Sequence, residues 1–593
     1  MIVKNIKIFN CLFLFVLYGL VSTKANFNVL KVGDRRELFV DNHLIEKLEG
    51  FARQSLNNPI PREIVFVSDK PWEGNGLNYV TVIKDSKNSY KMYYRGADYD
   101  RGVKSLHDQF YCLAVSKDGI KWRRPDLGLV EFKGSKANNI ILTEKDPVLG
   151  YICHNFSPFI DLNPEASISE KYKAIGGGPL FPLVSADGIL WKKATKKPII
   201  SQGAFDSQNL AFWDSVRREY RAYHREFRNG RDIMTETSPS FTDSWKKPVF
   251  LEYTPERGGE LYTNQITPYF RAPHIFVGFP TRYEDRGLTP STRHLPQWEY
   301  RQQRSKVSIR EGTAVTEGLF MSSRDGNNFT VFQEAFIRPG LRAKDSWFYG
   351  DNYQNNGLVE TKSSLAEDAP SELSMYLTEA TLQNGKPAKL RRYSIRMDGF
   401  VSITAPMKGG KLTTKLIQFS GHKLSINYSS SARGGIRVGI LGADGKTKKT
   451  SVILFSDEKG NNVRDYVGTQ RSTDLVMRES RLNVYLAFGT RHDKYGDILP
   501  ELPDDVLVQK DAKRNFPTSF RFPLWVDQGG KCAITGIEIP QVDIFDGKKY
   551  VIDHKIPHAA GIEAGGTTTF DNAQLVCYDE NKNKSDRIPT VTL

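Results

Sequence analysis

The residues whose types and spacing most clearly suggest chemistry lie near the C-terminus. Asp553 and His554 are adjacent at the end of a predicted strand, and Asn572 and Asn581 follow them, the latter on a predicted helix. Phosphodiester cleavage needs a base that activates water and a cation that holds the phosphate and the leaving oxygen. One imidazole, one carboxylate and an amide oxygen suit a hard divalent ion such as Mg²⁺. These residues therefore predict a compact metal site with nuclease chemistry.

The order of these residues resembles the ββα-metal, or HNH, endonucleases, over about residues 515–588. The resemblance includes the Gly-Gly-Lys-Cys lead-in at 529–532 and implies DNA as the substrate and Mg²⁺ or Mn²⁺ as the metal. It also implies that Asp553 and Asn581 bind the metal ion and that His554 is the general base. Asn572 would orient His554, and Lys584 would contact phosphate.

The cysteines of this region depart from the family pattern. Many members hold structural zinc with two Cys-x-x-Cys pairs. Here each pair keeps only its first cysteine: Thr535 replaces the partner of Cys532, and Glu580 replaces the partner of Cys577. We therefore expect no structural zinc in this region. The alternative to an active nuclease is an inactive remnant of one.

A second pattern recurs through the first four hundred residues. Val115–Trp122 and Val184–Trp191 share the sequence Ser-x-Asp-Gly-x-x-Trp, and weaker copies occupy 322–329 and 237–245. Asp-Gly between a strand that ends in Ser and an aromatic residue predicts a hairpin, because Gly tolerates a positive φ. Each copy lies in a longer unit of about seventy residues, which predicts a five-bladed β-propeller. Aromatic-rich strands mark the five units, and they begin at Tyr90, Tyr172, Tyr220, Ile275 and Leu373.

This arrangement resembles the catalytic propellers of glycoside hydrolase families 32 and 43 and their uncharacterised secreted bacterial relatives. The resemblance covers about residues 30–485, and 36–45 are similar to the start of one such secreted group. Glycoside hydrolysis needs two carboxyl groups, one acid and one base or nucleophile. Because such propellers build their site from the starts of successive blades, the resemblance implies Glu73, Asp161 and Asp206 as candidate catalytic residues.

Other interpretations of these carboxylates stay open. Asp351, with Asn352, opens the fifth blade in a similar position. An aspartate at the start of a blade often only caps a turn. The Asp-Pro-Asn and Arg-Asp-Pro motifs of better-known members are absent from these positions. A propeller that binds a glycan without hydrolysing it is therefore a direct alternative.

Changes in composition along the chain predict a mainly β protein of several parts. An apolar run of about eleven residues behind two lysines has the features of a secretory signal and is shorter than a membrane span. The expected parts are a signal peptide at 1–25, the propeller at 30–397, a small β-sandwich at 398–487, a linker at 488–514 and a small α+β HNH domain at 515–593.

The charge and cysteine content limit the compartment and the partners. The net charge of +15 is spread along the chain, which fits either a solvated basic surface or a face that attracts acidic polysaccharide or nucleic acid. Too few cysteines are present for a disulfide scaffold, and a Cys112–Cys153 bridge and two buried thiols are equally compatible with the sequence. The signal predicts a secreted or periplasmic protein without stable membrane insertion.

Together the patterns predict a metal-dependent HNH endonuclease that cleaves DNA, fused to a secreted propeller whose partner is an oligo- or polysaccharide. The alternative is a secreted glycoside hydrolase or a glycan-binding propeller. In that case the C-terminal module is a remnant or an artefact of gene fusion.

Overall fold

The computed structural model describes residues 29–441 apart from 101–103, 384 and 421–422, and then only separate segments. These segments are 447–454, 462–464, 472–489, 491–492, 498–499, 524–526, 528, 531–532, 537–541, 550–554 and 573–577. The chain divides into two compact units, Met1–Ile498 and Leu499–Leu593. The predicted signal peptide and most of the predicted linker lie outside the described residues.

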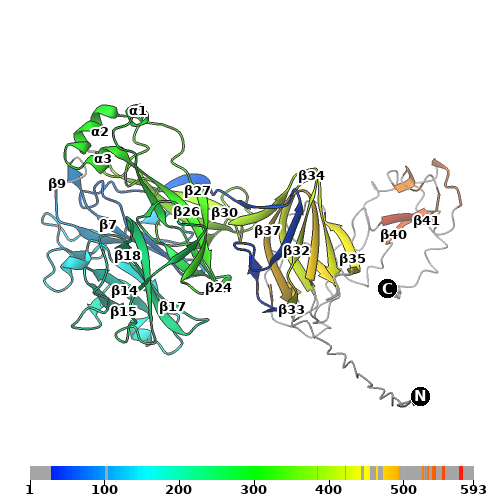
Figure 1. Ribbon diagram of the computed structural model, residues 1–593, viewed down its shortest axis with the longest axis horizontal. Helices are drawn as coiled ribbons and strands as arrows, with labels where there is room; N and C mark the ends of the chain where they lie inside the picture. The colour runs from blue at the N-terminus through cyan, green and yellow to red at the C-terminus, as the bar shows by residue number, and fades with distance from the viewer. Residues whose placement is uncertain are drawn as a thin grey trace, which may run out of the picture. The chain divides into compact units, whose positions relative to one another are not determined.

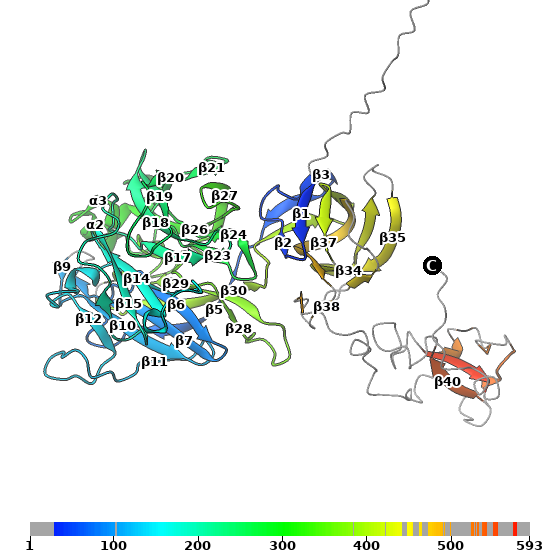
Figure 2. The same cartoon turned by 90° about the horizontal axis from the view of Figure 1, so that it is seen from below.

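Most of the first unit is a propeller-like arrangement of antiparallel sheets between residues 60 and 396 (Figures 1 and 2). The first sheet holds β6 (Thr81–Ser86), β7 (Ser89–Gly96), β10 (Phe110–Ser116) and β11 (Trp122–Arg123), with β12 (Ile140–Thr143) also paired to β10. The second holds β13 (Ser157–Ile160), β14 (Tyr172–Gly177), β15 (Leu180–Ser185) and β16 (Lys192–Lys193). The third holds β17 (Leu210–Asp214), β18 (Glu219–Phe227), β19 (Arg231–Ser238) and β20 (Val249–Phe250).

The fourth sheet is larger because it carries an insertion. Its main strands are β23 (Ile266–Tyr269), β24 (Ala272–Gly278), β26 (Ala314–Ser323) and β27 (Asn328–Ile337), joined by β21 (Glu252–Thr254), β22 (Glu260–Leu261) and β25 (Thr281–Asp285). Between β25 and β26 the chain forms three short helices, α1 (Pro290–Arg293), α2 (Trp298–Ser305) and α3 (Ile309–Thr313). No described helix combines the length and apolar character needed to cross a membrane.

The last sheet of this series joins distant parts of the sequence. Strands β28 (Val359–Thr361), β29 (Glu372–Glu379) and β30 (Lys389–Arg396) are completed by β5 (Ile60–Val67), which precedes the first sheet. The first strands of the sheets also contact one another, β13 with β6 and β17, β17 with β23, and β28 with β6. The pairing of β5 with β30 joins the two ends of the series of sheets, and it covers an edge of β30 that would otherwise be open.

The predicted Asp-Gly hairpins follow β10, β15 and β26. In the first one, Asp118 Oδ1 accepts the backbone N–H groups of Ile120 and Lys121, each at 2.8 Å, and Gly119 has a φ of +75°. The Tyr376 hydroxyl of another sheet donates to the carbonyl of Gly119 at 2.7 Å. Equivalent hydroxyl contacts join Tyr93 to Gly188 and Tyr223 to Gly326. The repeated motif therefore both turns the chain and docks one sheet on its neighbour.

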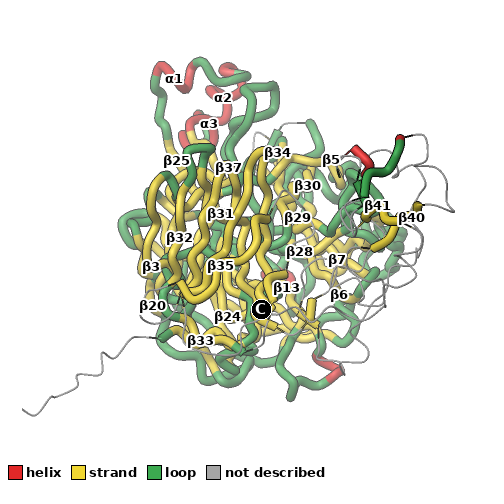
Figure 3. The backbone as a smooth tube through the Cα atoms, turned by 90° about the vertical axis from the view of Figure 1, so that its right-hand side faces the viewer, coloured by secondary structure: helices red, strands yellow, loops and turns green. Residues whose placement is uncertain are grey.

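A second β region lies in the same unit (Figure 3). Its core contains buried Phe39, Ile403, Leu412 and Tyr428. Its nine-stranded sheet comprises β2 (Glu37–Leu38), β3 (Ile45–Gly50), β4 (Arg53–Leu56), β31 (Val401–Ala405), β32 (Gly410–Thr414), β34 (Lys423–Leu441), β35 (Thr447–Leu454), β36 (Asn462–Arg464) and β37 (Ser472–Gly489). In addition, β1 (Leu30–Gly33) pairs in parallel with β33 (Ile417–Phe419), and β38 (Arg491–His492) pairs with β39 (Ile498–Leu499).

The boundary predicted at residue 30 for the propeller differs from this structure. Strands β1 to β4 pair with strands that follow residue 400, so residues 30–56 belong to the second β region. The reason is topological. Because β5 pairs with β30, the chain before β5 runs beside the chain after β30, as the antiparallel pair β4–β31 shows.

The described part of the second unit is small. Strands β40 (Tyr550–His554) and β41 (Ala573–Cys577) pair antiparallel, with Asp553 opposite Gln574 and His554 opposite Ala573. Near the predicted lead-in, the indole N–H of Trp525 donates to the carbonyl of Ile539 at 2.7 Å.

Candidate functional site

Four polar side chains meet at one end of the propeller-like sheets. His154 and Asp206 lie just before β13 and β17, whereas Arg95 and Arg225 lie near the ends of β7 and β18. In an antiparallel sheet, the start of one strand and the end of the next lie at the same edge. We call this end, defined by these four residues, the site face.

His154 and Asp206 form the centre of the site face. Imidazole Nε2 lies 2.7 Å from Asp206 Oδ1, and Nδ1 lies 3.2 Å from both Arg95 Nη1 and the amide oxygen of Gln109. A guanidinium only donates, so the contact with Arg95 favours the tautomer whose proton lies on Nε2 and is donated to Asp206, whereas the Gln109 oxygen would accept from a protonated Nδ1. The Asp206 side chain is 61% exposed. One carboxylate oxygen is thus held by the imidazole while the group stays open to solvent.

The charges around this pair set its protonation. Burial lowers the pKa of His154, and Arg95 lowers it further, against the raising effect of the bond to Asp206. Burial alone would raise the pKa of Asp206, but His154 and the two arginines lower it on balance. At neutral pH, Asp206 is therefore ionised and His154 is neutral.

Aromatic side chains enclose a hollow beside the pair. The hollow has a volume of about 300 Å³ and is lined by Tyr151, Phe205, His154, Asp206 and the glycines at 177–178. The Tyr151 ring is partly exposed, and its edge packs on Phe181. Flat rings next to a carboxylate and an imidazole suit a ligand that has both an apolar face and hydroxyl groups.

A network of buried amide side chains joins the first strands of neighbouring sheets. The Gln208 side chain, from the third sheet, donates to Thr81 Oγ1 of the first sheet at 2.9 Å, and Gln265 donates to Gln208 at 2.7 Å. Several buried polar atoms near it have no hydrogen-bond partner in the described part of the chain: Asn78 Oδ1, Ser207 Oγ, Asn209 Oδ1, Asn264 Oδ1, Gln265 Oε1 and Gln354 Oε1. Buried polar atoms of this kind are normally satisfied by water or by a ligand.

Tyrosines form the remaining wall of the site face. Tyr262 packs against Tyr349 and Tyr353, with ring centroids 5.9 and 5.5 Å apart. The guanidinium of Arg225 lies 4.9 Å from the Tyr262 ring, and that of Arg95 lies 5.1 Å from the Tyr79 ring. Burial raises the pKa of Tyr79 and Tyr353 well above the ordinary value. These phenols are neutral hydrogen-bonding groups at physiological pH.

Glu73, the first predicted carboxylate, lies in a closed ion pair. Its Oε1 accepts from Arg124 Nε at 2.6 Å and from the Tyr94 hydroxyl at 2.5 Å, and its Oε2 accepts from Arg124 Nη2 at 2.8 Å. Lys70 N–H also donates to Oε2, and the side chain is fully buried. Glu73 therefore has no open oxygen for a substrate in this arrangement.

Asp161 is held in a similar way between the second and third sheets. Lys173 Nζ lies 2.6 Å from its Oδ2, and the Tyr220 hydroxyl donates to the same oxygen at 2.7 Å. The backbone N–H of Asn163 donates to Oδ1 at 3.0 Å. The three predicted carboxylates thus do not share one groove, and only Asp206 lines the hollow.

Asp351 is also buried, next to the site face. Its oxygens accept the backbone N–H groups of Thr381 and Phe348 at 3.0 and 3.2 Å. Burial raises its pKa to about 7, because a charged carboxylate loses its hydration there. Its position fixes the loop that leads into the last sheet.

His154, Arg95 and Arg225 were not among the sequence candidates. His154 stands three residues before the Ser157–Asp161 segment that drew attention, and Arg95 directly follows the predicted strand Tyr90–Tyr94. A search for polar residues at both the start of each first strand and the end of each second strand would have found them.

The predicted nuclease residues are only partly described. Asp553 and His554 end β40, as the sequence predicted, whereas Asn572, Asn581 and Lys584 lie outside the described residues. No group of three or more His, Cys, Asp or Glu side chains within the described residues is placed to hold a metal ion. The metal site and the expected lack of structural zinc stay predictions.

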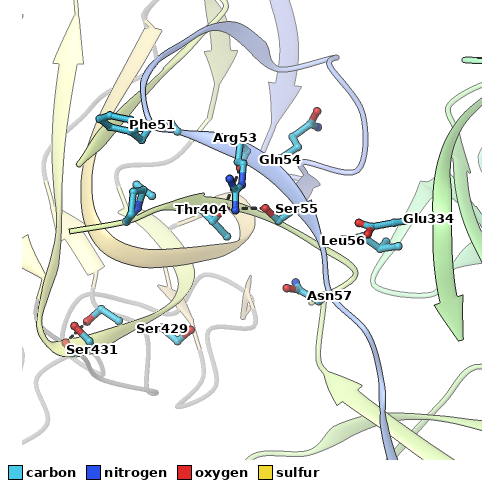
Figure 4. Close-up of a pocket in the computed structure, with 14 residues that line it drawn as sticks. Phe51, Arg53, Gln54, Ser55, Leu56, Asn57, Glu334, Thr404, Ser429 and Ser431 are labelled. Atoms are coloured by element: carbon cyan, nitrogen blue, oxygen red, sulfur yellow. Dashed lines mark hydrogen bonds between the residues drawn. The ribbon is translucent and has the colours of Figure 1, made fainter. Parts of the chain in front are cut away.

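A larger groove, of about 910 Å³, runs beside the segment that connects the second β region to β5 (Figure 4). Several of its polar side chains already have partners within the chain. Ser55 Oγ is 2.8 Å from Thr404 Oγ1, and Asn57 Nδ2 donates to the carbonyl of Gly399 at 2.8 Å.

Comparisons with known proteins give structural similarity only. No protein-family model matches the chain, and no curated protein matches it in sequence. Among solved structures, it is similar to the catalytic domain of the Coprinopsis cinerea family GH62 α-L-arabinofuranosidase, at 9% identity and a TM-score of 0.33, over 58% of this chain and 97% of that one. It is also similar to a family GH43 arabinoxylan arabinofuranohydrolase from Bacillus subtilis in complex with cellotetraose, at 11% identity and a TM-score of 0.24, over 73% and 99%. A third similar structure is the Bombyx mori family GH32 β-fructofuranosidase, at 10% identity and a TM-score of 0.31, over 73% and 94%.

Proposed function

We propose that residues 60–396 form a five-bladed carbohydrate-active propeller, which binds an oligosaccharide at the site face and hydrolyses a glycosidic bond there. One observation carries the proposal. Asp206 is the one predicted catalytic carboxylate that lines a hollow, remains open to solvent and is kept ionised, and aromatic rings flank it. Asp206 and His154 would meet sugar hydroxyls, and the rings would meet the apolar face of a sugar.

The roles follow from protonation. An ionised carboxylate can act as a nucleophile or a base, or stabilise the positive charge that develops on the sugar ring. His154 acts as a positioning residue, because its Nε2–H holds Asp206 Oδ1. No second open carboxylate lines the hollow among the described residues, so the proposal assigns no general acid.

The test is the release of reducing sugar from a panel of oligosaccharides by the full chain. We expect Asp206→Asn to abolish product formation and Glu73→Gln to retain it per folded molecule, as measured by product analysis and circular dichroism. If the parent retains the glycan on a column without forming product, the propeller is a binding module. Unchanged activity of Asp206→Asn would refute the assignment.

A second proposal concerns residues 515–593, which we infer to be a metal-dependent HNH endonuclease domain. It is supported by the antiparallel pair β40–β41, which leaves Asp553 and His554 together at the end of a strand. If the expected residues bind Mg²⁺ or Mn²⁺, the ion would supply the charge that stabilises the cleaved phosphodiester. Plasmid cleavage with either metal, lost in His554→Ala, would support this function, and no cleavage by the parent would make the domain a remnant.

A further inference from the structure

The buried or partly buried arginines of the first unit differ in whether a carboxylate neutralises them. Arg231 pairs with Glu260 at 2.7 Å, and the fully buried Arg304 pairs with Glu311. Arg95 makes no ion pair with a carboxylate among the described residues, and its nearest polar partner is the neutral His154. Arg225 reaches Asp206 only at 4.0 Å. Two guanidinium groups therefore share one carboxylate.

Both guanidinium groups lie in positions where excess charge is costly. Arg95 and Arg225 are 4% and 6% exposed, and Arg225 Nε has no hydrogen-bond partner within the described residues. A buried cation that lacks a counter-charge loses hydration without compensation. The rings of Tyr79 and Tyr262 offset a part of this loss through cation–π contact. A net positive charge of one remains beside the hollow.

A further cation stands at the aromatic rim. Lys193 Nζ lies 5.0 Å from the ring of Tyr151 and 4.5 Å from that of Phe181. Asp206 is the one acidic side chain that lines the hollow, and the formal net charge of the whole chain is +15. Both the local and the overall charge favour the approach of an anion.

We propose that the site face selects an acidic saccharide, one that carries a carboxylate or sulfate group, and that Arg95 and Arg225 bind this group. Arginine suits this role, because its planar fork matches carboxylate and sulfate oxygens with paired hydrogen bonds. The flanking rings of Tyr151 and Phe205 favour a sugar ring over an isolated inorganic anion. This inference rests on the proposed function, since it names the substrate class of the same site.

The experiment compares three tetrasaccharides of one backbone by titration calorimetry with the full chain: tetragalacturonate, galactotetraose and sulfated galactotetraose. We expect the acidic forms to bind at least about tenfold more tightly than the neutral one, with an affinity that falls as salt is raised. The carboxylate and sulfate forms distinguish the two sources of charge. A single-stranded DNA dodecamer serves as an anion without a sugar-hydroxyl face.

Arg225→Gln provides the residue test, and Arg218→Gln is its matched control. Arg218 is exposed in the turn between β17 and β18, at the opposite ends of these strands from Asp206 and Arg225. We expect Arg225→Gln to weaken acidic-sugar binding about tenfold or more and to change neutral-sugar binding little. Arg218→Gln should change neither. Unfolding midpoints of both variants show whether a loss of binding reflects misfolding.

The outcomes separate the two proposals. Equal binding or turnover of acidic and neutral sugars would overturn the acidic-substrate inference and leave the proposed function intact. No binding or product with any saccharide would overturn the proposed function itself. Tighter binding of the DNA than of either acidic sugar would make the site face a nucleic-acid surface. Unchanged acidic-sugar binding in Arg225→Gln would remove Arg225 from the site.

Discussion

The hollow around Asp206 and the sheet contacts around Glu73 and Asp161 place the same chemical group in opposite settings. All three carboxylates lie beside a first strand of the propeller-like sheets, Glu73 and Asp206 before β6 and β17, and Asp161 directly after β13. Glu73 and Asp161 are closed on both oxygens by a cation, a tyrosine hydroxyl and a backbone N–H, the cation being the partly exposed Arg124 for Glu73 and the buried Lys173 for Asp161. Asp206 is held on one oxygen by an imidazole and stays exposed.

The difference shows how a repeated scaffold divides its polar residues. A closed ion pair inside the sheets is costly to break, because the surviving charge stays buried. An exposed carboxylate contributes little to folding and is free to meet a ligand. The same residue type therefore joins strands and sheets at one position and, under the proposed function, meets substrate at another, and substitutions should separate the two roles.

The largest effect is expected at Asp206. Asp206→Asn should lower glycan turnover by about a thousandfold, as expected for loss of an ionised catalytic group. Its free energy of unfolding should fall by less than that of Glu73→Gln, because the exposed Asp206 side chain is solvated and reaches Arg225 only at 4.0 Å. Product analysis and urea unfolding of the same preparation measure both quantities. A large loss of stability would erase the contrast with Glu73.

Glu73→Gln is expected to do the reverse. Removal of the charge leaves Arg124 without its main partner, at a cost of about 3 kcal/mol in the free energy of unfolding. Asp69 is the matched control, because it lies 3.2 Å from the same Arg124 and is about half exposed. Asp69→Asn should cost under about 0.5 kcal/mol. Equal effects of the two variants in urea unfolding would show that burial does not decide the contribution.

Asp161 allows a sharper form of the same comparison. Asp161→Asn should cost about 2 kcal/mol, because Lys173 then stays buried with neutral partners, the hydroxyl and ring of Tyr220 and the ring of Phe241. Adding Lys173→Met should recover part of this loss, since no unpaired charge remains. A double-mutant cycle by chemical denaturation measures the coupling. Strictly additive losses would contradict the account.

The smallest effect concerns Asp351 and depends on pH. Its folded-state pKa of about 7 lies above the ordinary value of 3.8, so the folded chain binds the extra proton between these values. Stability contributed by this group therefore falls as the pH rises from about 4 to about 7. We expect the parent to lose about 1 kcal/mol more than Asp351→Asn between pH 6 and pH 7, since one pKa unit equals about 1.4 kcal/mol. Identical pH profiles of the two chains would show that this carboxyl titrates normally.

The sequence predicted much of the local structure. The Ser-x-Asp-Gly segments form hairpins because an Asp side chain, a Ser hydroxyl and a glycine with positive φ settle a turn within five residues. The aromatic-rich segments became the strands β7, β14, β18, β24 and β29. The mainly β character and the strand that ends in Asp553 and His554 were also visible. All of these depend on interactions between near neighbours in the chain.

Only the tertiary structure decided the rest. The pairing of β5 with β30 brings together residues more than 300 positions apart and moved residues 30–56 into the second β region. The tertiary structure also decided that Arg124 neutralises Glu73 and that Lys173 neutralises Asp161, whereas His154 and two arginines surround Asp206. Sequence spacing locates the carboxylates beside the first strands of the sheets. Arg124 and Lys173 come from the same sheets as Glu73 and Asp161, whereas His154 reaches Asp206 from the preceding sheet, so the charge beside each carboxylate depends on how the strands pair and the sheets pack and not on the local chain.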